Sequence, residues 1–202
     1  MSKTMKNKAV FLDRDGVINE VIYHKEMGII DSPFTVEQFK LLPKVATAIN
    51  KFHDLGFKVI VVSNQPGIAK DHFSMDVFEK IREKMKTELQ KKGAGVDAEY
   101  YCFHHPYAKV KKYKKICSCR KPKSGMILTA AREHTIDLSK SWMIGDGVND
   151  IAAGQNAGCK TIIIGRMKCD LCRYMEDENV KPDYIKPNLY KASLIIETKE
   201  RG

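Results

Sequence analysis

Short apolar runs alternate with longer amphipathic segments along this chain. The runs read as buried strands because they are short and rich in β-branched and aromatic side chains, and they occupy residues 9–12, 58–62, 141–144 and 161–164. Between them, apolar residues recur at helical spacing, as in Val45, Ala46, Ile49 and Phe52. The alternation predicts an α/β fold, a doubly wound parallel sheet with right-handed crossovers.

Residues that begin and end helices delimit the amphipathic segments. Pro43 is suited to open a helix and Gly56 to close it, while Ser74 and Ser124 are suited to cap the next two. These signals predict helices over residues 43–56, over residues 74–92, from residue 124 onward, and from Asn149 or Asp150 to about Gly158. The polar stretch from 167 to 187 predicts no defined element.

Polar residues of complementary chemistry follow three of the predicted strands. Asp13 and Asp15 come after the first, Ser63 and Asn64 after the second, and Gly145-Asp146 with Asp150 after the third. The carboxyl ends of parallel strands share one crevice, so these groups should converge there. On an extended backbone Asp13 and Asp15 would face one site while Arg14 points elsewhere, and Gly16 would let the chain turn. Carboxylates, a hydroxyl, an amide and glycine-rich turns suit a hard metal ion and a phosphoryl group; an acidic strand-to-loop corner is the alternative.

Length and charge narrow the classes of protein. The 202 residues suffice for one α/β domain, and we expect a single domain over residues 1–202. No apolar run approaches the ~18 residues of a membrane span, and residues 1–8 lack the apolar core of a secretory signal, so we expect a cytoplasmic protein that binds no membrane.

The formal net charge is +10, with basic residues crowded between 109 and 123. This run could attract an anionic substrate, bind nucleic acid or be a solvated loop. Only Tyr113 interrupts it with an aromatic ring, so we favour a phosphorylated small molecule over nucleic acid.

The cysteines form a second candidate site. Three of the six cysteines lie close to a histidine in the sequence: Cys102, His104, Cys117 and Cys119. Three thiolates and one imidazole are a ligand set of closed, tetrahedral structural zinc sites, and a zinc ion would order a lysine-rich loop with little core of its own. His105 is the alternative histidine ligand. Cys169 and Cys172 lack a second pair and are expected to be free thiols.

These motifs together resemble a known family. Asp13-Arg14-Asp15-Gly16-Val17, Ser63-Asn64, Arg120-Lys121-Pro122 and Gly145-Asp146 with Asp150 resemble the four motifs of the haloacid dehalogenase (HAD) superfamily of phosphatases. The Cys102-x-His104 and Cys117-x-Cys119 pairs resemble the branch that contains the D-glycero-D-manno-heptose 1,7-bisphosphate phosphatases and the histidinol-phosphatase domains. The resemblance covers about residues 8–164 and implies a HAD-like Rossmannoid fold. The short chain leaves no room for a large cap domain, so we expect an open site beneath a zinc-stabilised loop at about residues 100–122.

The resemblance also implies roles for the residues. Asp13 would be the nucleophile that forms an aspartyl-phosphate, and Asp15 the general acid and base. Mg²⁺ would be held by Asp13, Asp146 and the main-chain carbonyl of Asp15, with Asp150 beside the metal. The phosphoryl oxygens would be held by Ser63, Asn64 and Lys121, and Arg120 would contact phosphate or orient the substrate. As alternatives, Ser63 and Asn64 could cap a turn, Asp150 could cap a helix, and Arg120 could form a surface ion pair.

We therefore expect a monomeric, Mg²⁺-dependent phosphatase that contains Zn²⁺ and acts on a small phosphorylated metabolite, preferably a sugar bisphosphate. Histidinol phosphate and a nucleic-acid 3′-phosphate are alternative substrates, and a catalytically silent binding protein is a third class. One position departs from the heptose-phosphatase pattern, because Gly147 stands where that family usually carries a lysine after the Asp146 aspartate. Lys121 would then supply the positive charge near the nucleophile alone.

Overall fold

A six-stranded parallel sheet forms the centre of the computed structural model, which describes residues 6–165 and 180–201. The strand order is β5-β4-β1-β6-β7-β8, with every neighbouring pair parallel. The strands are β1 (Lys8–Leu12), β4 (Phe57–Asn64), β5 (Ala98–Cys102), β6 (Trp142–Gly145), β7 (Lys160–Ile164) and β8 (Tyr184–Lys186). The predicted doubly wound α/β architecture is confirmed.

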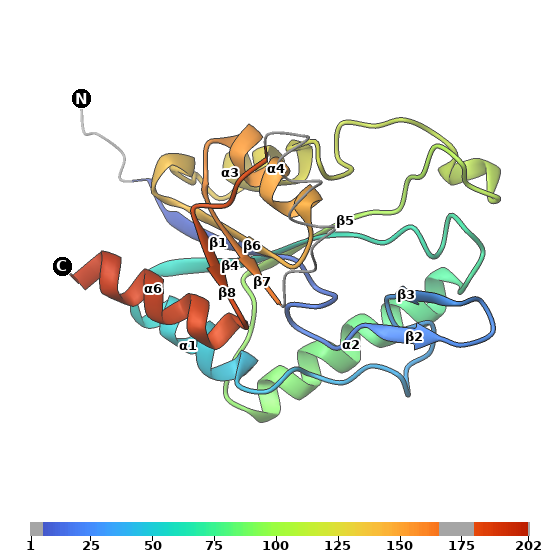
Figure 1. Cartoon of the computed structure of the whole chain (residues 1–202), viewed down its shortest axis with the longest axis horizontal. Coiled ribbons are helices and arrows are strands. Elements are labelled where there is room, and N and C mark those ends of the chain that lie inside the picture. Colours follow the sequence, from blue (N-terminus) through green and yellow to red (C-terminus); the bar gives the residue numbers. More distant parts are fainter. Residues whose placement is uncertain (1–5, 166–179, 202) are drawn as a thin grey trace.

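Helices cover both faces of this sheet (Figure 1). One face packs against α1 (Val45–Asp54), α2 (Met75–Lys91) and α6 (Leu189–Arg201). The other packs against α3 (Gly125–Glu133) and α4 (Val148–Ala157). Strand β1 serves both layers, because its side chains alternate between the two faces. Val10 and Leu12 lie in the core with α1, whereas Ala9 and Phe11 lie in the core with α3, and all of them are fully buried.

The predicted strands and helices are present, with small shifts at their ends. Ser74 caps α2 as predicted, since its hydroxyl accepts a hydrogen bond from Val77 N at 3.2 Å. Ser124 is the N-cap residue of α3 but makes no side-chain capping bond. The fourth helix begins at Val148, slightly earlier than predicted, because Asp150 caps it from within the first turn. Gly158 ends it with a φ of 84°, a left-handed conformation that favours glycine.

The sequence pattern did not predict strands β5 and β8 or helix α6. Strand β5, with the sequence Ala-Glu-Tyr-Tyr-Cys, is mostly half-buried at the sheet edge and lacks the continuous apolar run of a central strand. Strand β8 occupies the other edge and falls in the polar stretch 167–187, for which the sequence predicts no element. Helix α6 follows it and packs against α1 and β7. Edge strands need less apolar surface than central ones, so sequence pattern alone does not reveal them.

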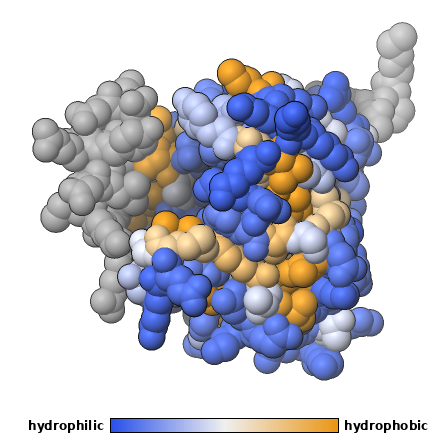
Figure 2. Space-filling view, turned by 90° about the vertical axis from the view of Figure 1, so that its right-hand side faces the viewer, coloured by the Kyte–Doolittle hydropathy of each residue, from blue (hydrophilic) through white to orange (hydrophobic). Residues whose placement is uncertain are grey.

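Two short insertions lie beyond the carboxyl ends of the strands. A hairpin of β2 (Ile22–His24) and β3 (Ile29–Asp31) precedes α1, and a loop that contains the short helix η1 (Lys111–Tyr113) follows β5 (Figure 1). Neither is a large cap, as expected. The side of the molecule that carries them is mainly hydrophilic, with a strip of apolar surface between the polar regions (Figure 2). Among the residues described, no helix is long and apolar enough to cross a membrane.

The core against α1 gives a direct test of this architecture. Ile49 is fully buried against the sheet, whereas Thr47 on the same helix is exposed. We expect Ile49→Ala to lower the free energy of unfolding by about 2–5 kcal/mol, since it leaves a cavity. Thr47→Ala should change it by less than about 0.5 kcal/mol. Urea denaturation of both variants measures the difference; equal stability would contradict the placement of α1.

Candidate active site

The carboxyl ends of β1, β4 and β6 bring the predicted polar residues together. Asp13 directly follows β1, and its main-chain N–H donates to Ile144 O of β6 at 3.0 Å. Asp13, Asp146 and Asp150 each offer one carboxylate oxygen, and these three atoms lie within 4.8 Å of one another. The predicted convergence of these strand ends is therefore confirmed. Oxygen donors in this number suit a hard divalent cation such as Mg²⁺, so this donor set fits the metal that the family resemblance implies.

Lys121 lies between two of these carboxylates, those of Asp13 and Asp150. Its Nζ atom is 3.0 Å from Asp13 Oδ1 and 2.5 Å from Asp150 Oδ1, and it donates to Val62 O at 2.8 Å. The side chain is almost completely buried. Among the ion pairs of the described residues, it is the one cation that pairs with Asp13, as we expected from Gly147. The main-chain N–H of Gly147 instead donates to Asp150 Oδ2 at 3.0 Å, so Asp150 both caps α4 and pairs with Lys121.

The protonation behaviour of the acids reflects their crowding. Burial raises the pKa of Asp13 to about 6; Lys121 lowers it, while Asp150 and Asp15 raise it further. Burial, with the charges of Asp13 and Asp150, raises the pKa of Asp146 to about 8. Burial opposes the charge of Lys121, yet the neighbouring carboxylates Asp13 and Asp150 hold its pKa above the usual value. The site therefore carries more negative charge than one ammonium group neutralises, which is the condition that favours a bound cation.

Ser63 and Asn64 end β4 beside this group. The Asn64 side chain donates to Lys121 O and accepts from Lys121 N, both at 3.0 Å, so it fixes the main chain that carries the ammonium group. The Ser63 hydroxyl is buried, accepts a hydrogen bond from Gln65 Nε2 at 3.1 Å, and lowers the pKa of Asp13 through a hydrogen bond. Ser63 thus borders the Asp13 carboxylate, whereas Asn64 acts on the main chain of Lys121.

Asp15 lies beside the carboxylate group with partners of its own. The strand ends at Leu12 and the chain turns, with Ile18 N donating to Arg14 O at 2.8 Å. The expectation that Arg14 points elsewhere is wrong, because this turn replaces the extended backbone on which it depended. Arg14 is fully buried and binds Asp15, as do Asn19 and Gln65. Sequence reasoning missed all three residues as part of the site.

Gly16 allows this turn to pass close to Asp146. Its φ is +79°, and a Cβ atom at this position would lie 2.0 Å from Asp146 Oδ2. A glycine is therefore required both by the backbone conformation and by the space. The predicted turn at Gly16 is confirmed, and its reason is the approach of the two loops.

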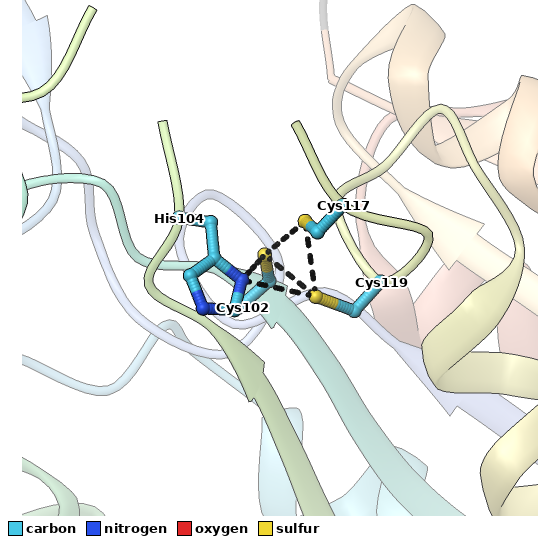
Figure 3. A group of neighbouring side chains, drawn as sticks. All are labelled: Cys102, His104, Cys117 and Cys119. Atoms are coloured by element: carbon cyan, nitrogen blue, oxygen red, sulfur yellow. Dashed lines mark hydrogen bonds between the residues drawn. The ribbon is translucent and has the colours of Figure 1, made fainter. Parts of the chain in front are cut away.

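The four predicted zinc ligands form a compact group (Figure 3). The Cys119 Sγ atom is 3.2 Å from the Sγ atoms of Cys102 and Cys117 and 3.4 Å from His104 Nδ1. The Sγ atoms of Cys102 and Cys117 are 3.6 Å apart. Ligands at ~2.3 Å from a tetrahedral zinc ion would be separated by about 3.8 Å. Three thiols and one imidazole nitrogen at these distances fit a zinc ion.

Two further candidates, His105 and Arg120, lie outside both groups. His105 Nδ1 accepts a hydrogen bond from Tyr107 N, and His105 is not part of the thiol group. Arg120 donates to His104 O at 3.3 Å, which ties it to the loop of the thiol group. Cys169 and Cys172 fall outside the described residues.

Comparisons with known proteins agree with these motifs. A family model described as HAD-hydrolase-like matches residues 118–192. The chain is 39% identical over 160 residues to a D-glycero-β-D-manno-heptose-1,7-bisphosphate 7-phosphatase of Haemophilus influenzae, covering 79% of this chain and 82% of the relative. It is 32% identical over 194 residues to a D-glycero-α-D-manno-heptose-1,7-bisphosphate 7-phosphatase of Photorhabdus laumondii, covering 95% and 98%.

A solved structure shares the architecture over nearly the whole chain. The D,D-heptose 1,7-bisphosphate phosphatase from B. bronchiseptica, complexed with magnesium and phosphate, superposes with a TM-score of 0.76 at 26% sequence identity. The match covers 95% of this chain and 99% of that protein. The similarity therefore extends beyond the motifs to the fold that carries them.

Gly16 and Gly28 offer a matched test of the carboxylate group. Both have a positive φ, but a Cβ at Gly28 would meet nothing within 4 Å. We expect Gly28→Ala to lower stability by roughly 1–2 kcal/mol from backbone strain alone. Gly16→Ala should lose about 1–3 kcal/mol more, because its methyl group displaces Asp146. Denaturation measures both, and a Gly16 variant as stable as the Gly28 variant would contradict the close approach.

Metal analysis tests the thiol group. Protein prepared without chelators should contain about one zinc ion per chain, because the four ligands form one closed site. We expect Cys119→Ala to lose this zinc. Cys159→Ala is the control, since Cys159 is a buried free thiol outside the group and the variant should retain the metal. Absence of zinc from the unmodified chain, or its retention in Cys119→Ala, would contradict the assignment.

Proposed function

We propose that this chain, which belongs to the HAD superfamily and is a phosphoric monoester hydrolase, is a Mg²⁺-dependent sugar-bisphosphate phosphatase of the heptose-1,7-bisphosphate type. The observation that carries the proposal is the buried Lys121 ammonium group between Asp13 and Asp150, at the crevice where the strand ends meet. In this arrangement the Asp13 carboxylate lies beside the Lys121 ammonium group, a cation that can attract and hold a phosphoryl group. The names of the relatives supply the substrate class.

Asp13 and Asp15 would divide the chemistry. An Asp13 carboxylate oxygen attacks phosphorus while the bond from phosphorus to the sugar oxygen breaks, and Asp15 gives its proton to that oxygen. Asp15 then takes a proton from water, whose oxygen attacks the aspartyl-phosphate and releases inorganic phosphate. Asp13 and Asp146, with the main-chain carbonyl of Asp15, would hold Mg²⁺, which when bound reduces the repulsion between carboxylate and phosphate.

The residues around Asp13 would hold the phosphoryl group. We assign its oxygens to Ser63, Asn64 and Lys121, in line with the family motifs. The Asn64 side chain already binds the main chain of Lys121, so its contribution would include keeping that loop in place. Asp150 would orient Lys121 and complete the negative charge around the metal.

A cavity with both basic and apolar side chains in its lining adjoins Lys121, and we assign it to the second anionic group of the substrate. Its volume is about 180 Å³, and its lining includes Lys115, Arg120 and Lys123. Several positive side chains around a small space attract a second phosphate group or another anionic end of the substrate. We therefore propose that Arg120 contacts the part of the substrate that is not hydrolysed. The zinc ion held by the neighbouring thiol group would keep this loop ordered.

Phosphate release by Asp13→Asn tests the mechanism. The variant should lose all measurable turnover while keeping its fold by circular dichroism, because an amide cannot form the aspartyl-phosphate. Asp54→Asn, at the exposed end of α1, should keep full activity. Unchanged turnover in the Asp13 variant would overturn the proposal. Omission of Mg²⁺ from the unmodified chain should also abolish release.

A substrate panel tests the specificity. We expect kcat/KM to be highest for heptose 1,7-bisphosphates, assayed as both anomers because the relatives include enzymes named for each. Histidinol phosphate and a 3′-phosphorylated oligonucleotide complete the panel. Preference for the oligonucleotide, with a steep loss of affinity as salt rises, would instead indicate a nucleic-acid enzyme.

A further inference from the structure

The carboxylate of Asp15 is enclosed by hydrogen-bond donors from three side chains. Arg14 donates to Oδ1 from Nε at 3.3 Å and from Nη2 at 3.1 Å, and Nη2 also lies 3.1 Å from Oδ2. Asn19 Nδ2 donates to Oδ1 at 2.9 Å, and Gln65 Nε2 donates to Oδ2 at 2.6 Å. Donors on both oxygens fix the plane of the carboxylate as well as its position.

Arg14 is itself held from several directions. Its side chain is fully buried, and Nη2 donates to Gln65 Oε1 at 2.9 Å. Its guanidinium carbon lies 5.6 Å from the centre of the Phe78 ring, within the range of a cation–π contact. A buried arginine without a function would be costly to retain, since the charge must be desolvated. Here the guanidinium group forms an ion pair with one carboxylate, that of Asp15.

Gln65 closes the network toward the nucleophile. Its Nε2 atom donates to Ser63 Oγ at 3.1 Å as well as to Asp15, so one amide spans the two residues. Its main-chain N–H donates to Cys102 O at 2.8 Å, which anchors it to β5. The amide is completely buried and uses both its donor and its acceptor atoms. Gln65 therefore sets the spacing between Asp15 and the Ser63 side of the site.

We propose that Arg14 and Gln65 are positioning residues that hold the Asp15 carboxyl group at the distance and angle its two proton transfers require. This inference rests on the proposed function, in which Asp15 protonates the leaving oxygen and later deprotonates water. Both transfers need Asp15 at hydrogen-bond distance from atoms on one side of phosphorus. A displacement of about 1 Å can lower a rate by on the order of 10²-fold.

Two substrates with different leaving groups can distinguish a loss of acid positioning from a general disruption of the site. A sugar alkoxide must receive a proton as the phosphorus–oxygen bond breaks, whereas p-nitrophenolate leaves without one. The ratio kcat/KM reports only the steps up to phosphoryl transfer to Asp13, before water is used. Loss of acid positioning should therefore lower kcat/KM for a sugar phosphate and leave kcat/KM for p-nitrophenyl phosphate nearly unchanged.

The experiment compares Gln65→Leu and Arg14→Lys with the unmodified chain on a sugar bisphosphate and on p-nitrophenyl phosphate. We expect kcat/KM to fall by on the order of 10²-fold for the sugar substrate and by less than about threefold for the aryl substrate. With the aryl substrate, kcat and KM should fall together, since hydrolysis of the aspartyl-phosphate still needs Asp15 as a base. If Arg14→Lys does not fold, Gln65→Leu alone tests the positioning role. Ile49→Ala, a core change outside this network, should alter neither ratio.

Asp15→Asn in the same assay separates the two proposals. If it lowers kcat/KM equally for both substrates, the acid role assigned to Asp15 fails. If it discriminates between the substrates but Gln65→Leu and any folded Arg14→Lys do not, only the positioning role is overturned. An equal loss on both substrates in the Gln65 and Arg14 variants would likewise show a general structural role and reject the inference.

Discussion

The Nζ atom of Lys121 lies between Asp13 and Asp150, at 3.0 and 2.5 Å, in a position from which water is almost excluded. Asp13, after β1, and Asp150, in the first turn of α4, would repel one another if this charge were absent, because burial strengthens their interaction. The position of the ammonium group is in turn fixed by Val62 O and by the Asn64 side chain on β4. One cation thus joins the three strand ends that form the site.

Much of this architecture follows from local sequence patterns. The central strands β1, β4, β6 and β7 are buried on both faces and therefore read as continuous apolar runs. Strands β5 and β8 could not be predicted in this way, because they lie at the edges of the sheet. An edge strand can contain polar residues such as Glu99 and needs no continuous apolar run. What decides their pairing is contact with β4 and β7, which lies outside the segment itself.

The site divides in the same way. Asp13, Asp146 and Lys121 could be predicted because polar residues directly after buried strands, or within a recognisable motif, point to a shared crevice. Arg14 could not, because its direction depends on where the strand stops and the turn begins. Gln65 could not either, since its importance lies in contacts to residues far away in the sequence. The spacing of residues in the sequence predicts which side chains lie near the site. Their hydrogen bonds in the folded chain determine which side chain orients which other one.

The thiol group and the carboxylate group share their supporting chain segments. Cys102 pairs in register with Asn64, and its carbonyl accepts the hydrogen bond from Gln65 N at 2.8 Å. Cys119 stands two residues before Lys121, so its position constrains the loop that carries the buried ammonium group. The basic loop buries Ala108 and Tyr113 in an apolar cluster with Phe73 and Phe78. The proposed zinc ion would also hold the ends of this loop through four ligands and so lower the entropy that the loop would otherwise retain. With that zinc ion bound, the thiol group would stabilise the segments that position Lys121 and Gln65.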